Sequence, residues 1–271
     1  MYLINTRTFE LEEFASSSSV RYAILSHTWH NGEVLFHDMA KSNLAQAQEK
    51  PGFRKILYTC QQAASSGLEY AWVDTCCINK TSSAELSEAI NSMFQWYKDA
   101  QVCYVYLNDL SRSQLAQMEE STESIEATFG KCRWFSRGWT LQELIAPSSV
   151  EFYDCEWEHI GSKQSLVGIL SHVTRIDHAV LDGSIKSSDV TAGRRMSWAS
   201  RRETTRVEDL TYSLMGIFEI NMPIMYGEGN KAFIRLQEEI LRVSGDWTNV
   251  FDQSFILSRD RLFAGVASQF G

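Results

Sequence analysis

The most informative segment of the chain is Phe135-Ser-Arg-Gly-Trp-Thr-Leu-Gln-Glu-Leu-Ile-Ala-Pro147. We expect a short helix that ends at Pro147, because proline disfavours helical geometry in the residue before it. Trp139 and Glu143 are four residues apart and would share one face of that helix. Two interpretations stay open: Glu143 is a solvated helix charge with Trp139 as a core anchor, or the pair belongs to a functional site.

The composition indicates a folded protein without long linkers. Of the 271 residues, 44% are hydrophobic and only 3 are prolines, which fits one large domain or two small ones. The formal charge of −9 gives no general attraction to nucleic acid or to anionic membranes. No apolar run is as long as a membrane span and no signal-peptide pattern is present, so we expect a cytoplasmic protein.

The cysteines and histidines predict neither a disulfide nor a metal site. The six cysteines show no framework spacing, and the six histidines are scattered. Cysteine within apolar segments behaves as a small hydrophobe, so we expect reduced thiols. The cysteines are Cys60, Cys76, Cys77, Cys103, Cys132 and Cys155.

Compact apolar segments alternate with helical patterns up to residue 154. This alternation is typical of an α/β fold, with a mainly parallel sheet flanked by helices. Residues 1–20, which are polar and include a run of four serines, are expected to be a loop before the core. The predicted strands are 22–26, 70–75, 102–107 and 150–153.

Helix signals divide the chain into two parts. The first helix is expected to stop at Gly67, and Ser82 with Glu85 matches a capping box for the next. From about residue 160 the pattern is helical, so we predict an α/β domain over 1–160 and a helical part, packed on it, over 161–271. In that part Thr205 and Glu208 match another capping box, and a final helix has the apolar residues Phe233, Leu236, Ile240 and Val243.

Polar residues follow each predicted strand. In parallel sheets, ligands bind beyond the carboxyl ends of the strands, at a point where the strand order reverses. We therefore expect a pocket formed by these residues and by the helix that carries Trp139 and Glu143. The strand-end residues are Ser26, His27, Trp29, Asp74, Asn108, Asp109 and Asp154.

Five arginines surround Trp198 and precede Thr205. They form either a solvated basic loop that balances Glu203, Glu208 and Asp209, or a clamp for phosphate or carboxylate, which suits the planar guanidinium. The arginines are Arg194, Arg195, Arg201, Arg202 and Arg206.

These motifs together resemble the fungal heterokaryon-incompatibility (HET) domain. The resemblance runs from about residue 20 to 243 and rests on the motifs Tyr22-Ala-Ile-Leu-Ser-His-Thr-Trp29, Trp72-Val-Asp-Thr-Cys-Cys-Ile-Asn-Lys80, Arg137-Gly-Trp-Thr-Leu-Gln-Glu143, Arg195-Met-Ser-Trp-Ala-Ser-Arg-Arg-Glu-Thr-Thr-Arg-Val-Glu-Asp209 and Met222-Pro-Ile-Met-Tyr-Gly-Glu-Gly-Asn-Lys-Ala-Phe233. It implies a cell-death effector, often linked to a nucleotide-binding sensor domain. The chain ends soon after Leu262-Phe263, which suggests that it was cut from a longer protein.

Residues 136–144, with the strand that follows, are more distantly similar to the third helix and fourth strand of TIR domains. Catalytic TIR domains hydrolyse NAD with a glutamate on that helix, and Glu143 falls on its position. Nothing after about residue 160 has a TIR counterpart, and the loop from Cys77 to Ser83 departs from the TIR pattern. The resemblance thus implies a TIR-like fold, NAD as substrate, self-association, and Glu143 as the catalytic residue.

One carboxylate is enough for this reaction. Nicotinamide leaves NAD as a neutral molecule, so no general acid is needed, unlike in ordinary glycosidases. Glu143 would stabilise the oxocarbenium-like transition state. Trp139 or Trp29 would stack on nicotinamide and Arg202 or Arg206 would hold pyrophosphate, with Ser26, His27 and Asp74 also in the substrate pocket.

The sequence is compatible with a second function and argues against a third. A non-catalytic signalling module would act by self-association or by recruiting a partner, for which eight tryptophans and the acidic segment 110–127 are suitable. A nuclease fits poorly, because the chain is acidic and has no carboxylate cluster of the kind that binds metal ions.

Overall fold

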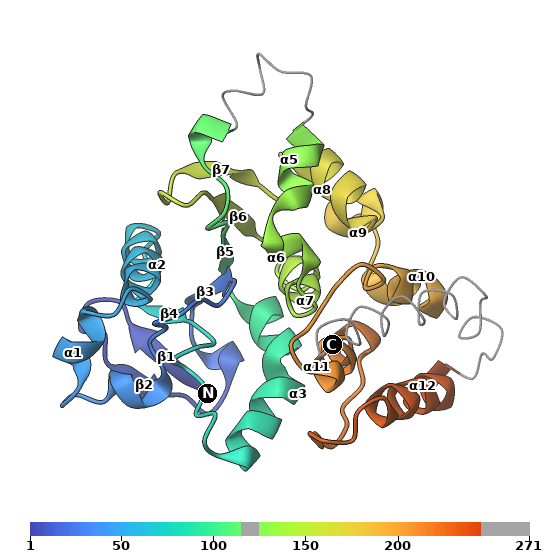
Figure 1. Cartoon of the computed structure of the whole chain (residues 1–271), viewed down its shortest axis with the longest axis horizontal. Coiled ribbons are helices and arrows are strands. Elements are labelled where there is room, and N and C mark those ends of the chain that lie inside the picture. Colours follow the sequence, from blue (N-terminus) through green and yellow to red (C-terminus); the bar gives the residue numbers. More distant parts are fainter. Residues whose placement is uncertain (115–124, 245–271) are drawn as a thin grey trace, which may run out of the picture. The chain divides into compact units, whose positions relative to one another are not determined.

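The computed structural model describes residues 1–114 and 125–244 and shows an α/β protein (Figure 1). Two compact units can be distinguished. The first contains residues 1–114 and 146–163, and the second contains residues 125–145 and 164–244 of the described chain. Residues 125–145 therefore group with the C-terminal half. The predicted division into domains near residue 160 stays a prediction.

The first unit is built on one seven-stranded sheet with the order β2-β1-β4-β3-β5-β6-β7. The four predicted strands are confirmed: β3, β4, β5 and β6 lie in this sheet and run parallel to one another. The edges are antiparallel, where β1 pairs with both β2 and β4, and β7 pairs with β6. The strands are β1 Tyr2–Asn5, β2 Leu11–Glu13, β3 Tyr22–His27, β4 Tyr70–Trp72, β5 Val102–Tyr106, β6 Val150–Tyr153 and β7 His159–Ser162.

The expected loop over residues 1–20 is wrong. Its first residues form β1 and β2, and the side chains of Leu3 and Ile4 are fully buried. The pattern was too short to recognise, because each strand has only three or four residues and depends on its neighbour for hydrogen bonds. The strand β7 was not predicted for the same reason, since it is a short edge strand with one buried residue, Gly161.

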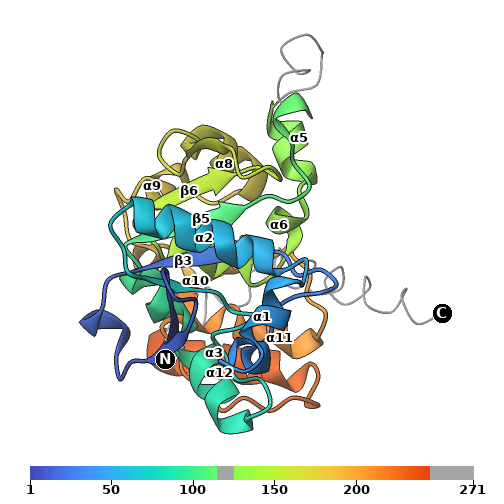
Figure 2. The ribbon, with the colours of Figure 1, turned by 90° about the vertical axis from the view of Figure 1, so that its left-hand side faces the viewer.

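Helices cover both faces of the sheet. Helix α2 contacts β3 and β4 and runs across the sheet in Figure 2. Just after α2, Ser66 Oγ lies 3.2 Å from the hydroxyl of Tyr104 on one face. On the other face Trp72 packs against Trp96 and Tyr97 of α3. The register separates these faces, because Tyr104 pairs with Leu25 and Trp72 with its neighbour Ile24.

The chain therefore leaves β3 toward one face and leaves the adjacent β4 toward the other. The order β4-β3-β5-β6 reverses at β3, because the chain moves outward from β3 to β4 and then returns past β3 to β5. The topological switch therefore lies between the carboxyl ends of β3 and β5.

The helix ends of the first unit follow the predicted signals. Helix α2 ends before Gly67, whose φ of 72° is the left-handed geometry favoured after a helix. Ser82 caps α3 by accepting a hydrogen bond from the amide of Glu85. The helices are α1 Leu44–Gln48, α2 Phe53–Ser65 and α3 Ser83–Asp99, with 3-10 turns at Ser17–Ser19 and Phe36–Met39.

The second unit is mostly helical, as predicted for the C-terminal part. Tight packing of α5 on α8 and of α11 on α12 joins its segments. The helices are α5 Ile125–Lys131, α6 Arg133–Ser136, α7 Thr140–Ile145, α8 Val167–Thr174, α9 His178–Leu181, α10 Ala192–Ser197, α11 Val207–Tyr212 and α12 Lys231–Ser244, with 3-10 turns at Ser187–Asp189 and Met215–Phe218.

Two details of the predicted C-terminal helices are wrong. Helix α11 starts at Val207 without a side-chain cap, so Thr205 and Glu208 form no capping box. The Glu208 carboxylate instead accepts hydrogen bonds from the amides of Gly227 and Gly229, both at 2.9 Å. On α12, Val243 is 65% exposed and does not belong to the buried face.

Candidate functional site

The predicted site residues form two clusters, one in each unit. The first holds Ser26, His27, Trp29 and Asp74, and the second holds Trp139, Glu143, Arg202 and Arg206. A pocket shared by both clusters stays a prediction, because the strand ends belong to the first unit and α7 to the second.

Asp74 is the centre of the first cluster. It follows β4, while His27 ends β3 and Trp29 lies two residues beyond. His27 Nε2 lies 3.0 Å from one carboxylate oxygen of Asp74, and Trp29 Nε1 donates to the other at 2.8 Å. The adjacent parallel strands thus bring an imidazole and an indole onto the two oxygens of one carboxylate.

The tautomer of His27 follows from its second neighbour, Lys55 on α2. The ammonium of Lys55 lies 3.0 Å from Nδ1 of His27, and an ammonium can only donate, so Nδ1 accepts. Nε2 therefore carries the proton and donates it to Asp74. Lys55 also donates to the carbonyl of Thr28 and pairs with Glu33. Each side chain of the series Glu33, Lys55, His27 and Asp74 is therefore bonded to the next by a hydrogen bond or an ion pair.

The Asp74 carboxyl stays ionised. Burial raises its pKa, but the charge of Lys80 and the hydrogen bonds from His27 and Trp29 outweigh burial and hold the pKa well below its usual range. Its side chain is nevertheless 25% exposed, so the carboxylate is accessible to a ligand.

The other strand-end residues contribute to the framework. Ser26 is fully buried within β3. After β5, Asn108 accepts a hydrogen bond of 2.8 Å from the hydroxyl of Thr28. Asp154 accepts three backbone hydrogen bonds in the loops around β6, and so has a structural role.

In the second cluster, Glu143 lies on α7 with a side chain only 7% exposed. The interpretation of Glu143 as a solvated helix charge is therefore wrong. The expected shared helix face is also wrong, because α7 begins at Thr140 and Trp139 precedes it. Trp139 is half-buried, and its side chain acts to lower the pKa of the Asp209 carboxyl.

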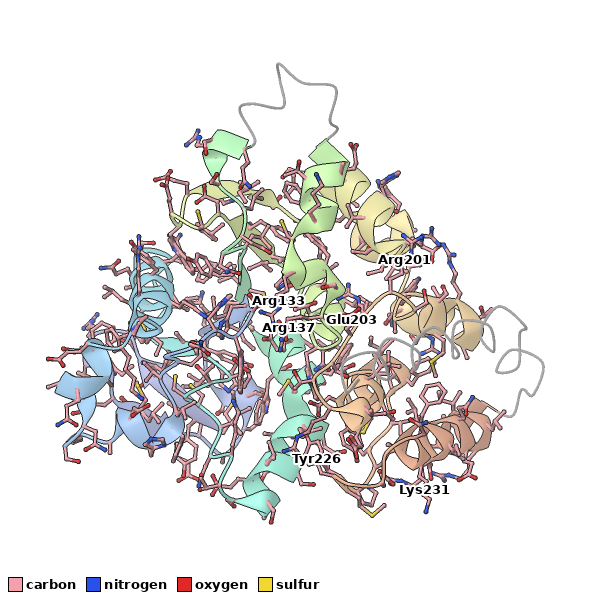
Figure 3. The ribbon with its side chains drawn as sticks, in the orientation of Figure 1. Arg133, Arg137, Arg201, Glu203, Tyr226 and Lys231 are labelled. Carbon is pink, nitrogen blue, oxygen red and sulfur yellow. The ribbon has the colours of Figure 1, made fainter. Side chains whose placement is uncertain are left out.

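The turn before α7 is fixed by a contact with a distant segment. The Gly138 amide donates to the carbonyl of Glu203 at 2.9 Å, and the Glu203 amide donates to the carbonyl of Ser136 at 2.6 Å. Arg137 and Glu203 pair here as a short parallel bridge (Figure 3). A Cβ on Gly138 would lie 2.5 Å from Cγ2 of Thr204, so only glycine fits.

Arg202 is buried beneath the start of α7, with 3% of its surface exposed. Its Nη1 donates to the carbonyl of Arg137 at 2.8 Å and to the hydroxyl of Thr140 at 2.7 Å, whereas Nη2 has no hydrogen-bond partner in the described part of the chain. Burial lowers the pKa of Arg202 to about 9, against the opposing effect of the Glu143 charge. Arg202 therefore holds the start of the helix that carries Glu143.

Arg206 is exposed and lies over the ring of Tyr226, 4.4 Å from its centroid. The hydroxyl of Tyr226 donates to Asp209 at 2.8 Å. Burial raises the pKa of Asp209, and the hydrogen bonds from Tyr226 and Trp139 oppose the rise. Asp209 is thus tied to the loop of Tyr226. Neither the role of Asp209 nor that of Tyr226 was expected from the sequence, although both residues lie within motifs that resemble the HET domain.

The remaining arginines of the block differ in use. Arg194 pairs with Asp177, and Arg195 donates to the carbonyl of Ile217, so neither balances the acids near Thr205. Arg201 is exposed (Figure 3).

Within residues 1–114 and 125–244, no group of three or more histidine, cysteine or acidic side chains is placed to hold a metal ion. No disulfide joins the six cysteines, all of which lie in the described part of the chain. No helix of these residues is long and apolar enough to cross a membrane.

Comparison with known proteins places the chain in a family. Residues 22–131 match the family model described as "Heterokaryon incompatibility protein (HET)". The chain carries a HET domain. It is also 48% identical, over 227 residues, to "Vegetative incompatibility protein HET-E-1" of Podospora anserina. That alignment covers 83% of this chain but 16% of the relative, so the HET domain described here corresponds to a small part of a much longer protein. No solved structure matches the chain.

Proposed function

We propose that this HET domain is a cell-death effector of fungal incompatibility that hydrolyses NAD to nicotinamide and ADP-ribose, with Glu143 as the catalytic residue. The incompatibility role is supported by the 48% identity to a protein named for vegetative incompatibility. The observation that carries the enzymatic part is that Glu143 is buried and that its charge acts on the equally buried guanidinium of Arg202. A glutamate that served only for solubility would be exposed.

The proposed reaction requires few catalytic groups from the protein. The bond between the ribose carbon and the nicotinamide nitrogen breaks, and its electron pair neutralises the pyridinium. Water then adds to the ribose carbon and loses a proton to solvent. The positive charge that develops on the ribose is stabilised by a fixed carboxylate in a water-poor site. The Glu143 charge opposes the lowering of the Arg202 pKa by burial, so the two groups interact electrostatically.

The substrate-binding residues remain part of the proposal. Trp139 and Arg206 in the second unit have solvent-accessible surface, whereas Arg202 offers only one buried nitrogen, Nη2. Arg206 is therefore the stronger candidate for pyrophosphate. In the first unit, His27, Trp29 and Asp74 form the strand-end cluster, and fully buried Ser26 supports it from β3.

The test compares Glu143→Gln with wild type in clustered protein, because self-association is part of the proposal. Glutamine keeps the shape and removes the charge, so NAD cleavage should fall about a hundredfold or more. The matched control is Glu85→Gln, since Glu85 is a helix-cap residue that accepts a hydrogen bond from Asn79. The control should cleave NAD normally. Full cleavage by a folded Glu143→Gln variant would remove Glu143 as the catalyst.

A non-catalytic signalling module is the second candidate. It is favoured by large apolar side chains that are exposed in the second unit, Met225 before α12 and Ile234 on it. Such residues suit self-association or a partner domain, for example a nucleotide-binding sensor in a longer cytoplasmic protein. Cell death that persists with Glu143→Gln, without NAD cleavage by wild type, would establish this alternative.

A further inference from the structure

Lys80 occupies an unusual place in the first unit. Its ammonium nitrogen lies 3.6 Å from the centroid of the Trp29 ring. That nitrogen is buried and makes no hydrogen bond within the described residues. Burial lowers the pKa of Lys80, and the charge of Asp74 is the strongest opposing influence. An ammonium has three donors and normally uses them, so this contact is maintained by the ring and by a nearby negative charge.

An aromatic face beside a carboxylate is what proteins use to bind cations. The indole of Trp29 is fixed to Asp74 through its Nε1, so the ring face and the carboxylate are held as one group. Asp74 is fixed in turn by His27, and His27 by Lys55. Trp29 and Asp74 are therefore held in place by contacts that do not involve Lys80.

The site is also accessible. The Asp74 side chain is one-quarter exposed, and Trp29 and Lys80 are half-buried. The site lies beyond the carboxyl ends of the adjacent parallel strands β3 and β4, which is the edge of such sheets where ligands bind. Lysine has a flexible four-carbon stem, so its ammonium can move to solvent when another cation takes its place.

We propose that Trp29 and Asp74 form a binding site for a flat organic cation, and that the ammonium of Lys80 occupies this site until such a ligand displaces it. The pyridinium ring of NAD belongs to this ligand class, and naming it here rests on the proposed function. A flat ring covers the indole more completely than an ammonium does, and it keeps the charge next to Asp74. Lys80 thus acts as an internal competitor that sets a threshold for ligand binding.

The experiment measures the binding of two probes by calorimetry to the full chain. N-methylnicotinamide carries the pyridinium charge, and nicotinamide has nearly the same ring without it. Lys80→Ala removes the competitor and should bind N-methylnicotinamide about fivefold or more tightly than wild type. Nicotinamide binding should change little. Lys80→Arg keeps a cation over the ring and should retain the weak binding of wild type.

A charge-matched control separates competition from a change in net charge. Lys98 is an exposed lysine on α3, and Lys98→Ala removes one positive charge without altering the Trp29 ring. The Lys98→Ala variant should bind both probes as wild type does. Equal gains in Lys80→Ala and Lys98→Ala, equal gains for both probes, or no gain at all would each overturn the proposal. Thermal unfolding shows that each variant is folded.

The result is independent of catalysis. If NAD is never cleaved but Lys80→Ala gains affinity for the cationic probe, the cation site stands and the proposed enzymatic function fails. If NAD is cleaved through Glu143 but Lys80→Ala gains nothing, the cation site fails alone.

Discussion

Gly138 offers a sharp test of how the second unit holds α7. In Gly138→Ala the new Cβ would lie 2.5 Å from Cγ2 of Thr204, where carbon atoms normally stay about 3.5–4.0 Å apart. The backbone cannot move away easily, because the Gly138 amide is bonded to the Glu203 carbonyl and the Glu203 amide to Ser136. The other neighbours of that Cβ, at 3.4 Å and 3.6 Å, are at ordinary distances.

The expected change in the free energy of unfolding of Gly138→Ala follows from two opposing effects. Forcing a methyl group into packed space costs about 1–3 kcal/mol. Replacing glycine by alanine also reduces the conformational entropy of the unfolded chain, which stabilises the folded state by about 0.4–1 kcal/mol. Gly138→Ala should therefore lower the free energy of unfolding by about 1–2 kcal/mol. Thr204→Ser removes the clashing Cγ2 but keeps the hydroxyl, which donates to the Arg206 carbonyl at 2.6 Å. The double variant should be close to wild type.

Urea unfolding of wild type, both single variants and the double variant gives the coupling free energy. We expect about 1–2 kcal/mol, in the direction of rescue. NAD cleavage, if present, should fall in Gly138→Ala and return in the double variant, because α7 follows directly. A double variant that is as unstable as the sum of the two single variants would show that Thr204 is not what excludes a side chain at Gly138.

Two further predictions concern buried cations. Lys163 is 5% exposed, donates to the Pro147 carbonyl at 2.5 Å, and has its pKa lowered to about 8 by burial. As the pH rises, the folded state loses this proton before the unfolded state does, so folding becomes more favourable. The free energy of unfolding of wild type, relative to that of Lys163→Met, should therefore rise by about 3 kcal/mol between pH 7 and pH 10.5. A difference that does not change with pH would contradict the burial of the charge. Arg202→Lys loses the two hydrogen bonds of Nη1 and should cost about 1–3 kcal/mol of stability. Its kinetics discriminate between roles: a lower kcat with the same KM indicates support of Glu143, and a higher KM indicates phosphate binding.

The sequence predicted the central sheet because its four parallel strands are compact apolar runs, buried on both faces. It missed β1, whose burial arises from pairing with β4 and not from a pattern of its own, and β2, which pairs with β1. Glu208 shows a similar limit. Its spacing from Thr205 matches a capping box, but the amides of Gly227 and Gly229 attract its carboxylate more strongly than the helix start does.

The candidate site likewise contains residues that the sequence could predict and residues that it could not. His27, Trp29 and Asp74 could be grouped from the sequence because adjacent parallel strands end at one edge. Lys55 and Lys80 could not, since lysine on a helix or in a loop normally points to solvent. Arg202 was expected either in a solvated loop or in a clamp for phosphate or carboxylate. It is buried, and no local pattern reveals that its partners are the carbonyl of Arg137 and the hydroxyl of Thr140.

The chain path through the second unit has an evolutionary consequence. Residues 125–145, which carry Glu143, lie in sequence between β5 and β6, yet Gly138 and Thr140 are held by Glu203 and Arg202. A recombination breakpoint anywhere between residues 146 and 163 would give α7 the C-terminal half of a different allele. Such hybrids inherit the glutamate intact but support it with foreign neighbours. Allelic variation confined to the last third of the domain can therefore change the surroundings of Glu143 without changing the residue itself.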